Sequence, residues 1–320
     1  LGHFQDGEVV NTGLDGPVGT NFSGYCFHDG QDFAIADNLG FNYLTEGVWS
    51  RMTEFEYPDV DDEYFNDQIE SLLEKTTSLE FDALGRIWVA SWGYGIAKGN
   101  IATEDWQIMD NSTNSELIGD GRDDYVVVTD MKCDSLGNMW VTLLAPSSHY
   151  PVLIYGPDGY EGSPIMKIGS DYTPLSSINQ PTCIDVKDKA WLGTVEGEVL
   201  GMDWHVYLTD TLYYTWYYYK EDEIPGGEVQ DIAVDSKGHV WVGTDYGLAR
   251  IEPEIDQVFE IVLPDNITPT INGIAIDKWD NVWLATSTGG LVISRFSGRF
   301  SRPMHGLTSV RPSPLTMFLA

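Results

Sequence analysis

The sequence predicts a β-propeller, an all-β fold in which four-stranded antiparallel blades repeat around an axis. One short pattern occurs six times, and five of the copies carry a tryptophan at the same place. The steps between copies are 55, 52, 51, 50 and 42 residues, a period typical of propeller blades. We interpret residues 1–320 as a single propeller domain. The repeat positions are Phe33, Trp88, Trp140, Trp191, Trp241 and Trp283.

The unit around Trp241 shows how each copy is expected to fold. The alternation from Ile232 to Val234 predicts a half-buried strand, and Asp-Ser-Lys-Gly at 235–238 predicts a turn. Residues 239–244 follow as a second strand, and residues 248–251 as a third. The turn between them ends in a glycine, which tolerates a positive φ. Each unit is therefore expected to form most of one antiparallel blade.

An aspartate precedes the repeat tryptophan by six residues in five copies. Its short carboxylate can accept hydrogen bonds from backbone amides of the following turn. The large aromatic side chain can fill the space between neighbouring sheets. We therefore expect both residue types to be structural rather than catalytic. The aspartates are Asp82, Asp134, Asp185, Asp235 and Asp277.

These residues resemble the two-component-regulator type of propeller repeat. The unit around Trp241 matches almost throughout, with Asp235, Gly238, and Gly243-Thr244 in the family's positions. The other copies keep parts of the pattern, and the resemblance spans about residues 21–295. NHL-type and lyase-type propellers share some of the same positions. The resemblance implies a sensor ectodomain of a bacterial hybrid regulator, or a secreted surface protein of similar build.

Six blades are expected, with seven as the alternative. Residues 313–320 have the pattern of one more inner strand, and residues 1–10 could supply an outer strand. Propellers commonly close by letting the two termini share a blade, so a composite seventh blade stays open.

The charge balance is strongly acidic, with a formal net charge of −33 from 17 basic and 50 acidic residues. Nucleic acids and anionic membranes are bound by clustered lysine and arginine, so neither is an expected partner. No apolar run approaches the length of a membrane span, so direct membrane insertion is not expected. An acidic solvated coat is common in extracellular proteins; the alternative is a surface that collects Ca²⁺ or a basic partner.

The three cysteines are expected to be free. Cys26 and Cys133 lie seven residues before their repeat aromatics, at an apolar position of an inner strand, so we expect small buried hydrophobes. Cys183 lies one residue earlier in its own unit. Equivalent positions in different blades are too far apart for easy bridging, so no disulfide is expected.

The first candidate site is a polar ring at the start of the inner strands. These strands line the channel of a propeller, and the positions eleven and ten residues before each repeat aromatic would lie at its mouth. The ring would bind a sugar, a peptide or a cation, or only hydrate the channel. Its members are Phe22, Ser23, Thr77, Ser78, Thr129, Asp130, Gln180, Pro181, Gln230, Asp231, Asn272 and Gly273.

The second candidate site is a run of acids that could bind Ca²⁺. Five acids occupy positions 1, 3, 5, 9 and 12 of a twelve-residue window, a spacing similar to that of an EF-hand loop. Tyr64 takes the place of the sharp-turn glycine, and the alternative is a solvated acidic insertion. The acids are Asp59, Asp61, Glu63, Asp67 and Glu70.

The third candidate site is the aromatic segment 213–219, which reads as an outer strand. One face can pack inside the blade, which leaves the other to stack on sugar rings or to bind a protein. The alternative is packing under a loop or against the next blade. We expect Trp216, Tyr217 and Tyr219 to contribute.

No catalytic motif stands out: the six histidines are scattered, and HExxH, GxSxG and phosphate-binding glycine loops are absent from the sequence. The leading hypothesis is an extracellular or periplasmic propeller that binds a ligand or protein, with a polysaccharide or oligosaccharide as a candidate ligand and no required cofactor. One alternative is a carbohydrate lyase or hydrolase using acids such as Asp130 and Asp231. The other is a structural subunit of an extracellular assembly that associates through Tyr217 and Tyr219.

Overall fold

The computed structural model is an all-β protein with short one-turn helical segments. Among the residues it describes, no helix is long and apolar enough to span a membrane. The structure describes residues 2–5, 8–11, 22–28, 32–37, 40–45, 47–53, 71–103, 105–110, 113–114, 117, 119, 125–157, 164, 166–168, 180–203, 216–263, 269–287, 290–294 and 316–318.

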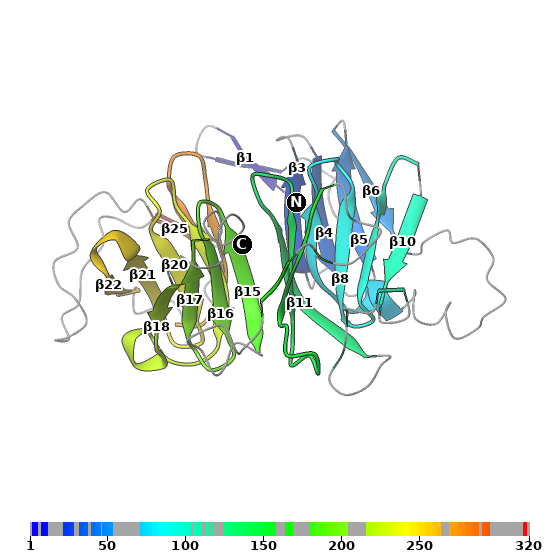
Figure 1. Ribbon diagram of the computed structural model, residues 1–320. Coiled ribbons are helices and arrows are strands. Elements are labelled where there is room, and N and C mark those ends of the chain that lie inside the picture. Colours follow the sequence, from blue (N-terminus) through cyan, green and yellow to red (C-terminus); the bar gives the residue numbers. More distant parts are fainter. Residues whose placement is uncertain are drawn as a thin grey trace. The chain divides into compact units, whose positions relative to one another are not determined.

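The chain divides into two compact units, Leu1–Lys167 (unit 1) and Ile168–Ala320 (unit 2), and each is described by itself. Unit 1 holds a hairpin, then a four-stranded meander, and then two more four-stranded meanders that are linked by one strand pairing. Figure 1 labels several of its strands. Its strands are β1 (Gly2–Gln5), β2 (Glu8–Asn11), β3 (Phe22–His28), β4 (Asp32–Asp37), β5 (Gly40–Thr45), β6 (Val48–Met52), β7 (Thr76–Phe81), β8 (Ile87–Gly93), β9 (Ile96–Asn100), β10 (Asp105–Met109), β11 (Val126–Cys133), β12 (Met139–Leu143), β13 (Val152–Tyr155) and β14 (Met166–Ile168).

Unit 2 holds three four-stranded antiparallel sheets, each in chain order. Its elements are β15 (Pro181–Val186), β16 (Ala190–Thr194), β17 (Val199–Met202), β18 (Trp216–Tyr219), η2 (Glu221–Glu223), β19 (Val229–Val234), β20 (Val240–Thr244), β21 (Leu248–Glu252), η3 (Pro253–Ile255), β22 (Gln257–Ile261), β23 (Ile271–Ile276), β24 (Val282–Thr286), β25 (Gly290–Ser294) and β26 (Thr316–Phe318). The predicted antiparallel four-stranded sheets are confirmed. The number of blades, and their closure into one domain, stay predictions.

Four of the five repeat aspartates clamp the turn between the first two strands to the repeat tryptophan. Asp134 is the clearest example: its Oδ1 accepts the backbone N–H of Leu136 and of Asn138, both at 2.9 Å. Its Oδ2 accepts Trp140 Nε1 at 2.9 Å and the Asn138 side chain at 2.8 Å. The structural role is confirmed here and in the equivalent bonds of Trp88, Trp241 and Trp283 to Asp82, Asp235 and Asp277.

The predicted turn role is wrong for the fifth aspartate, Asp185, because this residue lies in a strand. Trp88 lies opposite Glu80 on the neighbouring strand, whereas Trp191 lies opposite Asp185 itself. The β15–β16 turn is two residues shorter than its counterparts, so Asp185 belongs to the strand and not to the turn. Its carboxylate accepts the backbone N–H of Val234 in the next sheet at 2.8 Å.

The degenerate first copy is also shifted, by one residue. In β7, Ser78 is the first residue after the bulge, and it lies opposite Ala90 of β8. Trp88 precedes Ala90 by two residues. The same place in β4 is taken by Ala34, which is fully buried and lies opposite Cys26. Phe33 precedes it, and its ring lies 5.8 Å from that of Trp49. Without a tryptophan or a turn aspartate, this copy could not be aligned correctly from sequence.

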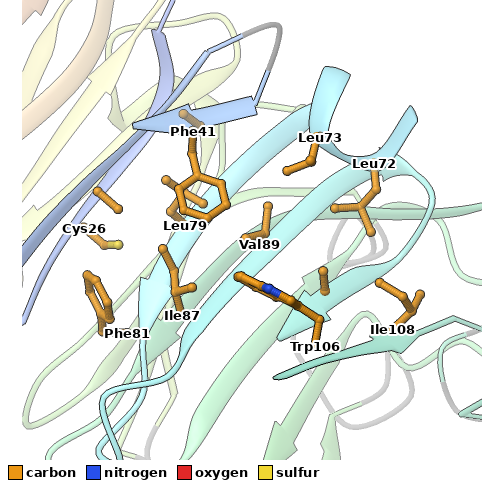
Figure 2. Packing of buried hydrophobic residues seen from close by; sticks show 13 residues of the cluster. Cys26, Phe41, Leu72, Leu73, Leu79, Phe81, Ile87, Val89, Trp106 and Ile108 are labelled. Carbon is orange, nitrogen blue, oxygen red and sulfur yellow. The ribbon is translucent and has the colours of Figure 1, made fainter. Parts of the chain in front are cut away.

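The core of each unit lies between neighbouring sheets. Figure 2 shows one cluster of unit 1, in which Phe41 from β5 lies beside Leu79 from β7 and Val89 from β8. Trp106 from β10 joins it, with its ring 6.2 Å from that of Phe41. The repeat tryptophans Trp88 and Trp140 are fully buried, as a role in filling space between sheets requires.

The chain end differs from the prediction. Residues 313–320 were expected to contain an inner strand of a further blade. Within them β26 (Thr316–Phe318) pairs with β25 and is the outer strand of the sheet that begins with β23. At the other end, β1 and β2 pair with each other as a hairpin.

The three cysteines carry free thiols. Cys26 is buried as expected, and its pKa is raised by burial and then by the charge of Glu80. Cys133 is only half-buried; burial, followed by the charge of Glu80, raises its pKa to about 12. Both thiols are protonated at neutral pH and are therefore weak nucleophiles. Cys183 is buried.

Candidate functional site

A β-bulge recurs in the first strand of each of the six four-stranded meanders that the structure describes. The pairing of that strand with the second shifts by one residue at one point, which leaves a single extra residue unpaired. A bulge interrupts the regular alternation of side chains along a strand. The same irregularity therefore reorients one side chain at each of six places. The bulged residues are Ser23, Thr77, Thr129, Thr182, Gln230 and Asn272.

Five members of the predicted ring are bulged residues: Ser23, Thr77, Thr129, Gln230 and Asn272. Phe22, Ser23 and Pro181 lie at the starts of β3 and β15. Gln180 lies two residues before the true bulge at Thr182, because the β15–β16 turn is short. The positions of these ring residues on their strands are thus described within each unit. That they form one closed ring stays a prediction.

Two of the bulged threonines connect neighbouring sheets. Thr77 Oγ1 donates to the carbonyl of Val128 at 2.6 Å, and Thr182 Oγ1 donates to the carbonyl of Val229 at 2.5 Å. Each acceptor immediately precedes the bulged residue of the next sheet. These hydroxyls hold the sheets together, so they are occupied by the fold itself.

The residue after the bulge also bonds within and between sheets. Asp231 Oδ1 accepts the N–H of Ile232 at 2.8 Å, and its Oδ2 accepts the N–H of Ile274 in the next sheet at 2.6 Å. In unit 1, Asp130 Oδ1 accepts the Ser78 hydroxyl at 2.7 Å and the N–H of Met131 at 2.8 Å. Both ring acids therefore stabilise the inner strands.

A second feature recurs at the same strand ends, and we call it the rim pair. The carbonyl of the residue two before the bulge accepts a backbone N–H from a residue near the end of the second strand. This donor directly follows the strand in four sheets and is Trp92 within β8 in the other. These bonds are 2.9 to 3.3 Å long. The rim pairs are Lys75–Trp92 and Val127–Leu144 in unit 1, and Gln180–Val195, Glu228–Asp245 and Thr270–Ser287 in unit 2.

The rim pairs keep one backbone bond while their side chains differ in every sheet. A constant backbone supports variable chemistry, which is how loops on a rigid scaffold carry specificity. Apart from Gln180, which was a predicted ring member, the rim-pair residues were missed from sequence because they do not belong to the repeat pattern. Their position, two residues before a polar bulge and at or directly after the end of the second strand, would have located them.

The Glu228–Asp245 rim pair has the most polar surroundings in unit 2. Asp245 Oδ1 accepts the Gln230 side-chain amide at 3.1 Å, and its Oδ2 accepts the N–H of Glu228 at 3.2 Å. Burial, followed by the charge of Asp245, raises the pKa of Glu228. Next to the pair lies Tyr246, whose side chain is 68% exposed.

A glycine, Gly227, lies directly beside Asp245 and Tyr246. Gly227 has a φ of +86°, and a Cβ on it would lie 2.7 Å from Asp245 Cβ and 2.9 Å from the Tyr246 ring. Any side chain there would displace both residues. The close approach of the backbone therefore holds Asp245 and Tyr246 in position.

Replacing Glu228 with Gln should stabilise the protein at neutral pH. A glutamate whose pKa is raised in the folded state favours folding when protonated and opposes it when ionised. The advantage of the variant should therefore be absent below the ordinary glutamate value of 4.5 and appear as the pH rises through the raised pKa. Thermal melting of both proteins from pH 4 to 7.5 measures this. An unchanged difference across that range would contradict the assigned surroundings of Glu228.

The aromatic strand packs mostly inward. The Tyr217 ring lies 5.5 Å from that of Trp191, and buried Tyr219 lies 6.4 Å from the same ring. Tyr218 donates its hydroxyl to Glu198 at 2.5 Å; burial and this bond raise its pKa to about 12. Trp216 is half-buried. Tyr217 and Tyr219 thus contribute to the core, the alternative considered for this segment.

The predicted calcium ligands Asp59, Asp61, Glu63, Asp67 and Glu70 lie outside the described residues. Among the residues described, no cluster of histidine, cysteine and acid side chains could hold a metal ion. A calcium site in the acidic window therefore stays a prediction.

Comparison with known families supports the repeat assignment. Residues 223–246 match the family model for the two component regulator propeller. This segment includes Trp241, Asp235 and the Glu228–Asp245 rim pair, and confirms the resemblance in the best-preserved unit. A search of curated protein sequences finds no significant match.

Solved structures share the fold at low sequence identity. The extracellular domain ascribed to the hybrid two component system BT3049 from B. thetaiotaomicron is 17% identical, with a TM-score of 0.61 over 85% of this chain and 32% of that chain. PorZ, a surface component of the type-IX secretion system of Porphyromonas gingivalis, is 16% identical, with a TM-score of 0.65 over 90% and 42%. A gluconolactonase from Xanthomonas campestris is 14% identical, with a TM-score of 0.55 over 85% and 84%.

This chain spans less than half of the first two structures. At these identities the likeness shows the fold alone, which is a β-propeller.

Proposed function

We propose that this chain, which carries a two-component-regulator propeller repeat, is an extracellular or periplasmic module that binds a saccharide without converting it. The fold is shared with extracellular domains of two component systems and with a secretion-system surface component, which supports this location and role. The proposed ligand is an oligosaccharide or a polysaccharide segment. A protein partner is the alternative.

The observation that carries the proposal is the rim pair: a constant backbone bond with side chains that vary from sheet to sheet. The Glu228–Asp245 pair supplies carboxylate oxygens and Gln230 an amide, groups that bond sugar hydroxyls. Exposed Tyr246 supplies an aromatic face for a sugar ring. A few convergent polar groups beside an aromatic surface are typical of small-molecule sites.

The two alternatives have less support. A lyase or hydrolase would use Asp130 and Asp231, whose carboxylates are bonded to the inner strands. A scaffold would associate through Tyr217 and Tyr219, which pack against Trp191. The side-chain bonds of Asp245 stay within its own sheet, to Gln230 and to the N–H of Glu228, and its backbone carbonyl accepts the Thr270 hydroxyl of the next sheet at 2.9 Å. The joining of sheets here therefore uses the backbone of the pair and leaves the Glu228 and Asp245 side chains on one sheet.

Tyr246→Ala should weaken saccharide binding about tenfold, the scale of losing an aromatic stacking contact of about 1.4 kcal/mol. The matched control is Trp279→Ala, because Trp279 is also 68% exposed but lies in the turn at the opposite end of the strands. The pure chain is incubated with a panel of neutral and acidic polysaccharides, with Ca²⁺ or with EDTA. Retained protein and released products are recorded together.

Retention that Tyr246→Ala reduces and Trp279→Ala leaves unchanged supports the binding module. Release of oligosaccharides would replace the proposal with a carbohydrate-active enzyme. Absence of retention on every polysaccharide would favour a protein partner instead. Loss of retention in EDTA alone would support the calcium site predicted at residues 59–70.

A further inference from the structure

We infer that the Lys75–Trp92 rim pair of unit 1, with Tyr94, binds the carboxylated ring of an acidic saccharide such as a uronic acid. The inference rests on the proposed function and names the ligand class at a second rim pair. It assigns an aromatic surface and a cation, where the Glu228–Asp245 pair presents two acids.

The aromatic surface is built around an exposed tryptophan. The Trp92 residue is 44% exposed, and its backbone N–H donates to the carbonyl of Lys75 at 2.9 Å. Tyr94 lies two residues later, with the Lys75 ammonium 5.1 Å from the centre of its ring. The Tyr125 ring packs so closely on Gly93 that a Cβ there would lie 2.6 Å from it. Trp92, Tyr94 and the Lys75 cation therefore lie at a single strand end, and Tyr125 packs on Gly93 between the two aromatic residues.

The backbone fixes this group before any ligand arrives. β8 pairs with β11 of the next sheet through Trp92 opposite Val127 and Gly93 opposite Val126. Gly95 N–H donates to the Val126 carbonyl at 3.2 Å. Figure 1 shows β8 beside β11 within unit 1. Because strands from two sheets hold these residues, binding would order few side chains and retain more of the interaction energy.

The charge of Lys75 points to an anionic group. Acidic residues outnumber basic ones 50 to 17 in the chain, so an exposed lysine would readily find a carboxylate. Within the part of the chain that the structure describes, Lys75 forms no ion pair, and its ammonium contacts an aromatic ring instead. An ammonium held by a ring keeps its donors for a ligand carboxylate, and a charge-assisted bond of this kind is stronger than a neutral one. Trp92 supplies the face on which the sugar ring stacks.

The test compares two probes, oligogalacturonate and its methyl-esterified form, in which each carboxylate is replaced by an uncharged methyl ester. Titration calorimetry of the wild-type protein should show tighter binding of the acid form. Lys75→Met keeps the aliphatic stem and should remove about tenfold of that preference, the scale of one charge-assisted hydrogen bond. The matched control Lys220→Met removes an exposed lysine of unit 2 and should leave the preference unchanged. Trp92→Ala should weaken both probes.

An equal preference in wild type and Lys75→Met would overturn the inference. If neutral glycans bind through Tyr246 while neither galacturonate probe binds, the inference fails and the proposed function stands. If no saccharide of any kind binds, both fail. Near-ultraviolet circular dichroism of each variant confirms that the fold is intact, and because Lys75 is exposed, its substitution should not prevent folding.

Discussion

Asp134→Ala is expected to lower the free energy of unfolding by about 3 kcal/mol, because it leaves several buried hydrogen-bond donors without an acceptor. Those donors are the N–H groups of Leu136 and Asn138, the Asn138 side chain and Trp140 Nε1. The loss exceeds that of a single bond because one carboxylate serves them all. Urea unfolding monitored by circular dichroism measures it.

Asp185→Ala is the matched control, since Asp185 is also a buried aspartate six residues before a repeat tryptophan. Its carboxylate accepts the Val234 amide and does not belong to a turn, so the loss should be about 1 kcal/mol. If both variants lost the same free energy of unfolding, the conclusion that Asp134 clamps a turn and Asp185 does not would be contradicted.

Asp231→Asn should cost about 2 kcal/mol of stability and leave any ligand binding at the rim pairs intact in the folded protein. Asp231 accepts one backbone N–H on each oxygen, from Ile232 and from Ile274 of the next sheet. Asparagine has one acceptor oxygen, so its amide group would face one of these donors. Urea unfolding and saccharide titration of the same preparation measure the two effects.

Asp130→Asn is the control for this substitution, because the bonds from Ser78 and Met131 both go to Oδ1, which asparagine keeps. It should lose less stability than Asp231→Asn. If Asp231→Asn folds with unchanged stability but abolishes turnover of a saccharide, the carboxylate is catalytic and the enzyme alternative is restored.

The repeat pattern predicted the strands, the turns and the structural aspartates well, because these depend on local residue order. Asp82, Asp134, Asp235 and Asp277 bind their tryptophans through a turn of fixed length, so the spacing alone was sufficient. Asp185 has the same spacing and a different role. A turn shorter by two residues moves it onto the strand, and strand register cannot be counted from one sequence.

The sequence placed the candidate ring at the correct strand ends, but it did not predict which of the ring's side chains form hydrogen bonds within the fold. Polar residues at Thr77, Asp130 and Asp231 looked available for a ligand, whereas their partners come from the next sheet, about fifty residues away in the chain. The aromatic strand has the same limit. Whether Tyr217 faces solvent or Trp191 depends on which face of β18 the sheet buries.

The sequence by itself determined the fold class and the repeat, which rest on a short pattern that recurs along the chain, and the turn clamps, which rest on residues less than ten positions apart. Only the tertiary structure decided which polar side chains join sheets and which remain at the rim. It showed that Asp231 bonds to Ile274, and that Glu228 with Asp245, and Lys75 with Trp92, share a constant backbone bond. The physical reason is that a polar group's role depends on whether its hydrogen bonds are made within the fold, and those partners come from distant segments.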